Sequence, residues 1–297
     1  MISRLLMALA IFMPLAAHAS DPVCKEAYDR LYNKPKVDVR VVFGYKDARP
    51  ARFVGDRHER LAFVQKITAK CEGPDDNACG FVRSSHNADL FEKSIRTPAG
   101  RKVTVELRVT HSSVGSDDAS NRVDPFQSWQ SVYARRTFLM GIESADVVLY
   151  NGHSRFGGGP DFDPPKLRKT QEINASYYKT KRPGLKETVA ALKSRPKGRD
   201  PKKSLKILGM FSCESSQHFT EEIQKRSATA LITSKGLLYY ADAFQNSLAA
   251  LDSLLGSRCE RGFKSALRQG DDESGSRLAG FFKPQNNSRM NASRQRP

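Results

Sequence analysis

The distribution of hydrophobic and polar positions along the chain predicts strands that alternate with helices. Short runs rich in valine, leucine or isoleucine have the alternating or continuous apolar pattern of strands, and longer runs carry apolar side chains at helical spacing. We expect strands at Val37–Tyr45, Val103–Val109, Val147–Tyr150, Leu205–Phe211 and Ala230–Thr233. We expect helices at Glu59–Ala69, Asp124–Ser144, Gly184–Leu192, Gln217–Arg226 and Ala241–Leu255.

This alternation predicts an α/β fold in which an open sheet of mostly parallel strands carries helices on both faces. We assign the main domain to residues 102–282. The preceding segment, residues 20–101, either pairs into the same sheet or forms a small lobe of its own. In the helix expected at Asp124–Ser144, an apolar face is formed by Phe126, Trp129, Val132, Tyr133, Leu139 and Met140.

The first 19 residues have the pattern of a secretory signal peptide. Met1–Arg4 is positively charged, Leu5–Ala16 is almost wholly apolar, and Ala17-His18-Ala19 has the small-x-small pattern of a cleavage site. The apolar run is shorter than the ~20 residues that a membrane span needs, and no later stretch is long and apolar enough. We therefore expect a secreted or periplasmic protein without a transmembrane segment in the mature chain; the alternative is an N-terminal anchor.

The positive charge of the chain indicates which classes of binding partner to expect. The net charge is +17 at pH 7, and Lys166–Lys206 alone holds fourteen Lys and Arg against three acidic residues. Residues 283–297 are also basic and are expected to form a disordered tail. An anionic surface or polymer is therefore a possible partner. No run interleaves basic and aromatic residues as single-strand-binding platforms do, so we expect no specific nucleic-acid partner.

Five cysteines in an exported chain indicate disulfides. Cys71 and Cys79 flank a turn-rich segment that a local disulfide would close. Cys24 lies near the mature N-terminus and Cys259 near the end of the last expected helix, so that pair would tie the ends of the domain together. Four cysteines allow three pairings, and we propose this one. It leaves Cys213 unpaired.

Two reactive side chains follow two successive strands of the expected sheet. His153 comes after Val147–Tyr150, and Cys213 comes after Leu205–Phe211. Ligands of open α/β sheets bind at the carboxyl ends of the strands, and neighbouring strands lie ~4.8 Å apart, so both side chains can reach one crevice. A thiolate attacks carbonyl carbon, and a nearby imidazole can accept the thiol proton and later protonate the leaving group. These residues predict a Cys–His dyad.

The same two segments resemble a known family. DVVLYNGHSRFGG, around His153, resembles the strand-and-histidine element of clan CD cysteine peptidases (caspases, gingipains, legumain, separase and CHAT domains), and LKILGMFSCESS, around Cys213, resembles their strand-and-cysteine element. The resemblance implies a caspase-like three-layer fold, with His153 as general acid/base, Cys213 as nucleophile, and the N–H groups of Ser154 and Cys213 as the oxyanion hole. The family usually has glycine where this chain has Ser154. Linkers between the two elements are often processed in relatives, which implies self-cleavage within Lys193–Lys203.

These features together predict an exported cysteine endopeptidase that acts on a protein or peptide substrate, with no cofactor. We expect no metal site, because the histidines and cysteines lack the short paired spacings of zinc sites, and no serine hydrolase, because no Gly-x-Ser-x-Gly elbow is present. Candidate substrate contacts are Ser112, Gly152, Gly157, Glu214 and Ser234. Weaker candidates for this site are His111, His218, Asp161 and Asp163.

Two other functions are compatible with the same residues. An inactive relative would keep the caspase-like fold and bind a polyanion or a protein partner through its basic surface. The dyad could also serve another acyl transfer or hydrolysis.

Overall fold

The computed structural model describes residues 21–46, 55–194, 205–225, 227, 229–267 and 275–283. The strands are β1 (Lys36–Phe43), β2 (Val82–Arg83), β3 (Leu90–Arg96), β4 (Lys102–His111), β5 (Val147–Asn151), β6 (Ile207–Phe211), β7 (Ala230–Ser234) and β8 (Ser276–Ala279). The helices are α1 (Pro22–Leu31), α2 (Asp56–Thr68), α3 (Asp118–Val123), α4 (Gln127–Ser144), α5 (Ala175–Lys181), α6 (Pro183–Ser194), α7 (Ser215–Gln224), α8 (Tyr240–Leu255) and α9 (Glu260–Leu267).

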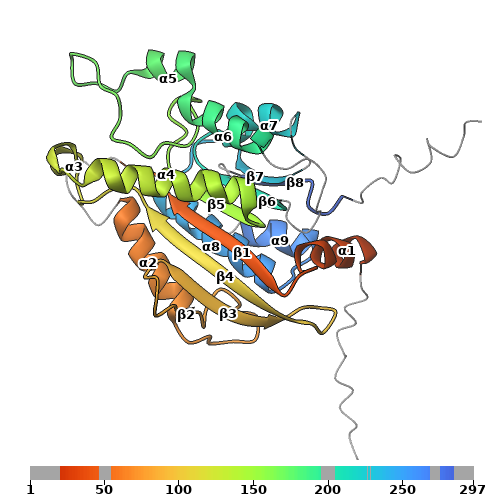
Figure 1. Ribbon diagram of the computed structural model, residues 1–297. Helices are drawn as coiled ribbons and strands as arrows, with labels where there is room; N and C mark the ends of the chain where they lie inside the picture. The colour runs from red at the N-terminus through yellow and green to blue at the C-terminus, as the bar shows by residue number, and fades with distance from the viewer. Residues whose placement is uncertain are drawn as a thin grey trace, which may run out of the picture.

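All these strands belong to one sheet, with the order β2-β3-β4-β1-β5-β6-β7-β8 (Figure 1). The five central strands, from β4 to β7, are parallel to one another. The edge strands β2, β3 and β8 pair antiparallel. The expected α/β open sheet of mostly parallel strands is therefore confirmed. Strands β1, β2 and β3, from the segment before residue 102, belong to the same sheet.

Helices cover both faces of the sheet and make three layers. One core contains apolar side chains of α1, α2, α8 and α9, packed on one face of the strands. The other core contains side chains of α4, α6 and α7, packed on the opposite face. In Figure 1, α4 crosses in front of the sheet while α8 and α9 lie behind it. The central strands are buried on both sides, which explains why β5 and β6 are continuously apolar.

Helix α4 does not bury most of the apolar face that its sequence predicted. Its buried positions are mostly small or polar, whereas Trp129 is 77% exposed and the neighbouring Phe126 is 69% exposed. The physical reason is close packing against the sheet: a Cβ on Gly141 would lie 2.8 Å from Arg40 Cδ and 2.9 Å from Val148 Cγ2. At this point of close approach only a small side chain fits; Phe138 and Ile142 still face the core, while Phe126 and Trp129 face outward.

Both proposed disulfides are present, which confirms the pairing. Cys24, in α1, is joined to Cys259, which lies just before α9. Two tyrosine hydroxyls stabilise the same junction. Tyr28, in α1, donates its hydroxyl to the Arg258 carbonyl at 2.6 Å. Tyr32, directly after α1, donates its hydroxyl to the Leu254 carbonyl at 2.6 Å. The two ends of the domain are therefore tied together by covalent and hydrogen bonds.

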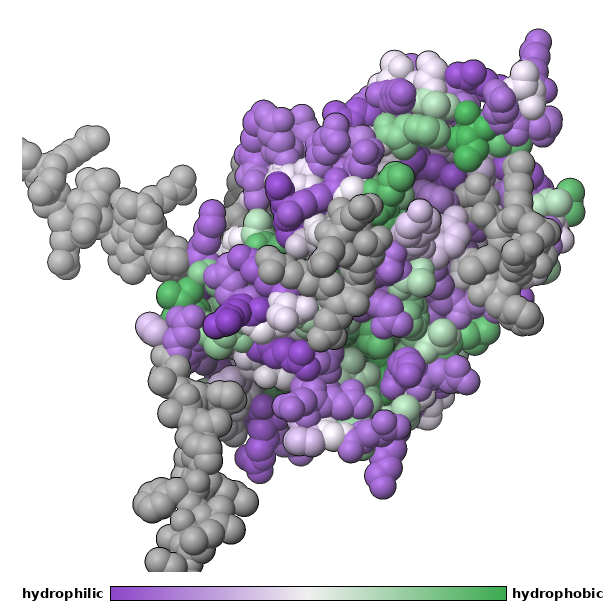
Figure 2. All heavy atoms as spheres, turned by 180° about the vertical axis from the view of Figure 1, so that it is seen from behind, coloured by the Kyte–Doolittle hydropathy of each residue, from purple (hydrophilic) through white to green (hydrophobic). Residues whose placement is uncertain are grey.

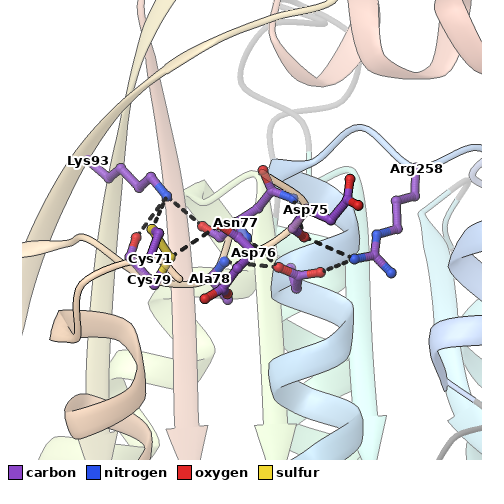
Figure 3. Close-up of a disulfide and its surroundings, with 9 residues drawn as sticks. Cys71, Asp75, Asp76, Asn77, Ala78, Cys79, Lys93 and Arg258 are labelled. Atoms are coloured by element: carbon purple, nitrogen blue, oxygen red, sulfur yellow. Dashed lines mark hydrogen bonds and ion pairs between the residues drawn. A yellow bond between two sulfur atoms is a disulfide. The ribbon is translucent and has the colours of Figure 1, made fainter. Parts of the chain in front are cut away.

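The second disulfide, Cys71–Cys79, closes a short loop that is fixed on two sides (Figure 3). Lys93 Nζ, from β3, donates to the carbonyls of Asn77 and Cys79, both at 2.7 Å. On the other side, the backbone N–H groups of Asn77 and Ala78 donate to one carboxylate oxygen of Asp252 in α8, at 2.7 and 3.0 Å. The loop thus connects the antiparallel edge of the sheet to α8.

The surface opposite α4 is mostly hydrophilic, with hydrophobic side chains gathered in smaller areas between hydrophilic ones (Figure 2). Within the ranges described above, no helix is both long and apolar enough to cross a membrane. The expected signal peptide, the basic tail after Lys283 and most of the expected self-cleavage segment Lys193–Lys203 lie outside the described residues.

Candidate active site

The two candidate catalytic residues lie beyond the carboxyl ends of neighbouring parallel strands. β5 and β6 are paired as far as Asn151 and Phe211, and Gly152 N–H extends the ladder by donating to the Phe211 carbonyl at 3.2 Å. His153 and Cys213 each follow two residues after these paired positions. The sheet therefore places both residues at the same edge, on adjacent strands.

Tyr150 fixes the backbone of the loop that carries the histidine. Its hydroxyl oxygen lies 3.0 Å from the His153 carbonyl, to which it can donate, and accepts from Asp161 N–H at 2.9 Å. A Cβ on Gly152 would lie 2.3 Å from the same oxygen. Glycine is therefore required at position 152 because the buried Tyr150 ring occupies the space where a side chain would be.

Replacing Tyr150 with phenylalanine is expected to lower the free energy of unfolding by about 1–3 kcal/mol, because the Asp161 N–H loses its buried acceptor. Urea unfolding followed by far-ultraviolet circular dichroism measures this change. Tyr239→Phe is a suitable control, since that side chain is exposed. Equal stability of the two variants would contradict the role given to the Tyr150 hydroxyl.

A buried ion pair supports the same loop from inside. Arg155 Nε donates to Asp161 Oδ2 at 2.8 Å. Burial raises the pKa of Asp161, and the Arg155 guanidinium opposes that rise. Arg155 and Phe156 have positive φ angles of 40° and 55°, followed by Gly157 at 81°. The chain therefore turns sharply just after the histidine. The Arg155–Asp161 pair holds the two sides of the loop that follows together.

Cys213 has a partly exposed thiol and forms no disulfide. Its Sγ accepts from Leu238 N–H at 3.4 Å, so the segment after β7 lies directly against the sulfur. Ser215 stabilises the turn that follows: its hydroxyl donates to the Met210 carbonyl at 2.7 Å and accepts from Ser234 N–H at 2.8 Å. Helix α7 begins at Ser215, and the N-terminus of a helix favours a negative charge such as a thiolate.

The His153 ring contacts a residue of α8. Its Nε2 lies 3.1 Å from the hydroxyl oxygen of Tyr240, the first residue of α8, and the two rings meet edge to face. Triad-like sites need a third group that orients the imidazole. For the proposed dyad, Tyr240 is the candidate for that group.

The predicted substrate contacts occupy two kinds of position. Gly157 is next to α7, since a Cβ there would lie 3.0 Å from His218 Nδ1, and Glu214 follows the thiol directly, in a left-handed conformation. Ser112 and Ser234 are fully buried. The Ser112 hydroxyl donates to the Phe43 carbonyl at 3.0 Å, so it has a structural partner.

The remaining candidates are spread around the site. Ser154 is buried directly after His153. His218, in α7, lies 3.4 Å from the Glu214 carboxylate, and Asp163 forms an ion pair with Arg135 of α4. His111 ends β4, which is separated from β5 by β1. Burial, followed by the nearby charge of Arg60, lowers the pKa of His111 to about 4, so this imidazole is neutral at pH 7.

Sequence reasoning missed the buried polar residues near the ends of β1 and β5. Lys46 comes just after β1, and its ammonium donates to the carboxylate of Glu59 and, at 2.8 Å, to Asn151 Oδ1. The strand-end argument that identified His153 could also have identified Lys46, because both follow parallel strands. Tyr240 had no such signal, since it begins a helix and reaches the site only through packing.

No cluster of three or more His, Cys, Asp or Glu side chains suited to a metal ion occurs among the residues that the structure describes. In comparisons with known proteins, no family model, curated relative or solved structure matches this chain.

Proposed function

We propose that this protein is an exported cysteine endopeptidase in which Cys213 is the nucleophile and His153 the general acid/base. The main support is that Cys213, the one cysteine outside the two disulfides, follows the strand next to the one that leads to His153. The fixed turns on both sides support it further, because catalysis needs groups held in place before the substrate arrives. The resemblance to clan CD peptidases points to the same reaction.

The proposed reaction proceeds through an acyl-enzyme. With Nε2 donating to Tyr240, Nδ1 of His153 accepts the thiol proton while the sulfur of Cys213 bonds to the peptide carbonyl carbon. The N–H groups of Ser154 and Cys213 receive the negative charge on the oxygen. As the intermediate collapses, the C–N bond breaks and the amine leaves with the proton from His153. Water, deprotonated by His153, then attacks the thioester, and the C–S bond breaks to release the acid.

Export is part of the proposal. Disulfides form and persist in oxidising compartments, and this chain contains two of them. Together with the signal-peptide pattern of residues 1–19, they support a secreted or periplasmic location. A protein or peptide in that compartment is the proposed substrate.

Alkylation of the thiol tests the dyad without knowledge of the substrate. We expect iodoacetamide to modify Cys213 rapidly at pH 6, as located by mass spectrometry, because the imidazole supports a reactive thiolate below the pH where an ordinary thiol ionises. In His153→Ala the rate at pH 6 should fall about tenfold or more. A His218→Ala variant, with a histidine near but outside the proposed dyad, serves as the matched control. A thiol that stays unmodified, or that reacts equally in His153→Ala, would rule out the dyad.

The alternative is an inactive protein of this fold that binds a polyanion or a protein partner through its basic surface. The observation in its favour is the net charge of +17. Binding to an anionic polymer that weakens steeply with salt, combined with an unreactive Cys213, would support this alternative.

A further inference from the structure

Lys46 is a buried cation at the base of the candidate site. Its side chain is 1% exposed, and it forms an ion pair with Glu59 of α2. It also donates to Asn151 Oδ1 at 2.8 Å, and Asn151 Nδ2 in turn donates to Ser247 Oγ of α8 at 3.2 Å. Lys46 therefore joins the ends of β1 and β5 to helices α2 and α8.

The same ammonium also contacts the tyrosine that holds the histidine. Lys46 Nζ lies 4.6 Å from the centre of the Tyr240 ring, within the distance of a favourable cation–π interaction. The hydroxyl of that ring is 3.1 Å from His153 Nε2. A continuous path of contacts therefore runs from Glu59 through Lys46 and Tyr240 to the imidazole.

Lys46 is also within electrostatic reach of the thiol. Burial lowers the pKa of Lys46, and the negative charges of Glu59, Asp56 and Cys213 act in the opposite direction. Asp56 has other partners, since it accepts from the N–H groups of Ser112 and Ser113, both at 2.7 Å. Burial outweighs these charges, so the pKa of Lys46 stays below its ordinary value; in its charged form, the ammonium favours negative charge on Cys213.

We propose that Lys46 is a positioning residue with two roles: it holds Tyr240 against His153, and its charge favours the thiolate of Cys213. This inference rests on the proposed function, since it assumes that Cys213 reacts as a thiolate. The proposal also gives the buried Lys46–Glu59 pair a role. Burying two charges costs free energy, and replacing such a pair by well-packed hydrophobic residues is often neutral or stabilising.

The test compares rates of iodoacetamide alkylation of Cys213 from pH 5 to 9 in the folded mature protein. Lys46→Met/Glu59→Gln removes both charges, so no carboxylate is left buried without its partner. We expect its rate to fall about tenfold at pH 6 and to approach the wild-type rate at pH 9, where thiols in general are largely ionised. Lys36→Met/Glu106→Gln removes a Lys–Glu pair between β1 and β4, far along the sheet from the thiol, and should leave the profile unchanged.

Tyr240→Phe tests the second role and avoids disturbing the charged pair. It keeps the ring over Lys46 but loses the bond to His153, so alkylation at pH 6 should slow by about threefold. A wild-type pH profile in Lys46→Met/Glu59→Gln, or a wild-type rate in Tyr240→Phe, would overturn the proposal. The His153→Ala variant distinguishes failure of this proposal from failure of the proposed function. If Cys213 is alkylated slowly in His153→Ala but at the wild-type rate in Lys46→Met/Glu59→Gln, the dyad is supported and only the role of Lys46 is wrong.

Discussion

Replacing Cys213 with alanine is expected to abolish peptide-bond hydrolysis, with kcat/KM lower by on the order of 10⁴-fold or more. The reason is that the acyl-enzyme cannot form without the sulfur, and no other cysteine can replace it, since the remaining four are paired in disulfides. The measurement is cleavage of a peptide library by the mature protein, with the products identified by mass spectrometry and the best peptide then used for kinetics.

Two further variants make that result specific. Cys213→Ser should be almost as inactive, because a serine hydroxyl ionises far less readily than a thiol. Lys36→Met/Glu106→Gln, which alters an exposed pair between β1 and β4, should retain most of the activity. Cleavage by Cys213→Ala at the wild-type rate would show that the activity belongs to another group.

Loss of the Cys24–Cys259 disulfide is expected to cause the largest change in stability. This bond joins residues separated by 235 positions, so it restricts the unfolded chain strongly. In the chain-entropy model, Cys24→Ser/Cys259→Ser should lower the free energy of unfolding by about 5 kcal/mol. A loss of that size is comparable to the whole stability of many domains. Urea unfolding followed by far-ultraviolet circular dichroism measures it.

The second disulfide provides the matched comparison. Cys71 and Cys79 are separated by only eight positions, so Cys71→Ser/Cys79→Ser should cost about 2 kcal/mol by the same reasoning. Its loop also keeps the hydrogen bonds to Lys93 and Asp252, which do not depend on the sulfurs. Equal losses in the two double variants would show that loop length does not determine the contribution of these bonds.

The five parallel strands could be predicted from the sequence because their buried positions are apolar. Strands β5, β6 and β7 are buried along their whole length and gave short apolar runs, whereas β1 and β4 were identified by the alternation of apolar and polar positions. The edges were missed for the complementary reason. In β3, only Phe91 is fully buried, and the outward positions carry polar side chains such as Glu92, so the apolar pattern is weak. Strand β8 is four residues long, which is too short for periodicity to detect.

The sequence also did not show which side of the helix at residues 124–144 packs on the sheet. The spacing at residues 124–144 correctly predicted a helix, but periodicity reports where apolar side chains lie, not which side faces the sheet. That side was decided by Gly141 and other small residues, which allow α4 to approach Arg40 and Val148 closely.

For the candidate site, sequence reasoning reached the residues whose position depends on strand order alone. His153 and Cys213 follow successive strands, and parallel pairing brings their backbones to the same edge. The residues that support them come from distant parts of the chain. Glu59 and Tyr240 belong to α2 and α8, and they meet Lys46 only when both helices pack on the same face of the sheet. Such contacts require the tertiary structure.

The outward face of α4 has a practical consequence for spectroscopy. Trp129 is the single tryptophan of the chain, and it is 77% exposed in the native state. Its fluorescence should therefore have a red-shifted emission maximum before any denaturant is added, and unfolding should change it little. Trp129 instead reports on its own surroundings: a blue shift of its emission in a mixture would reveal that another molecule has covered this helix.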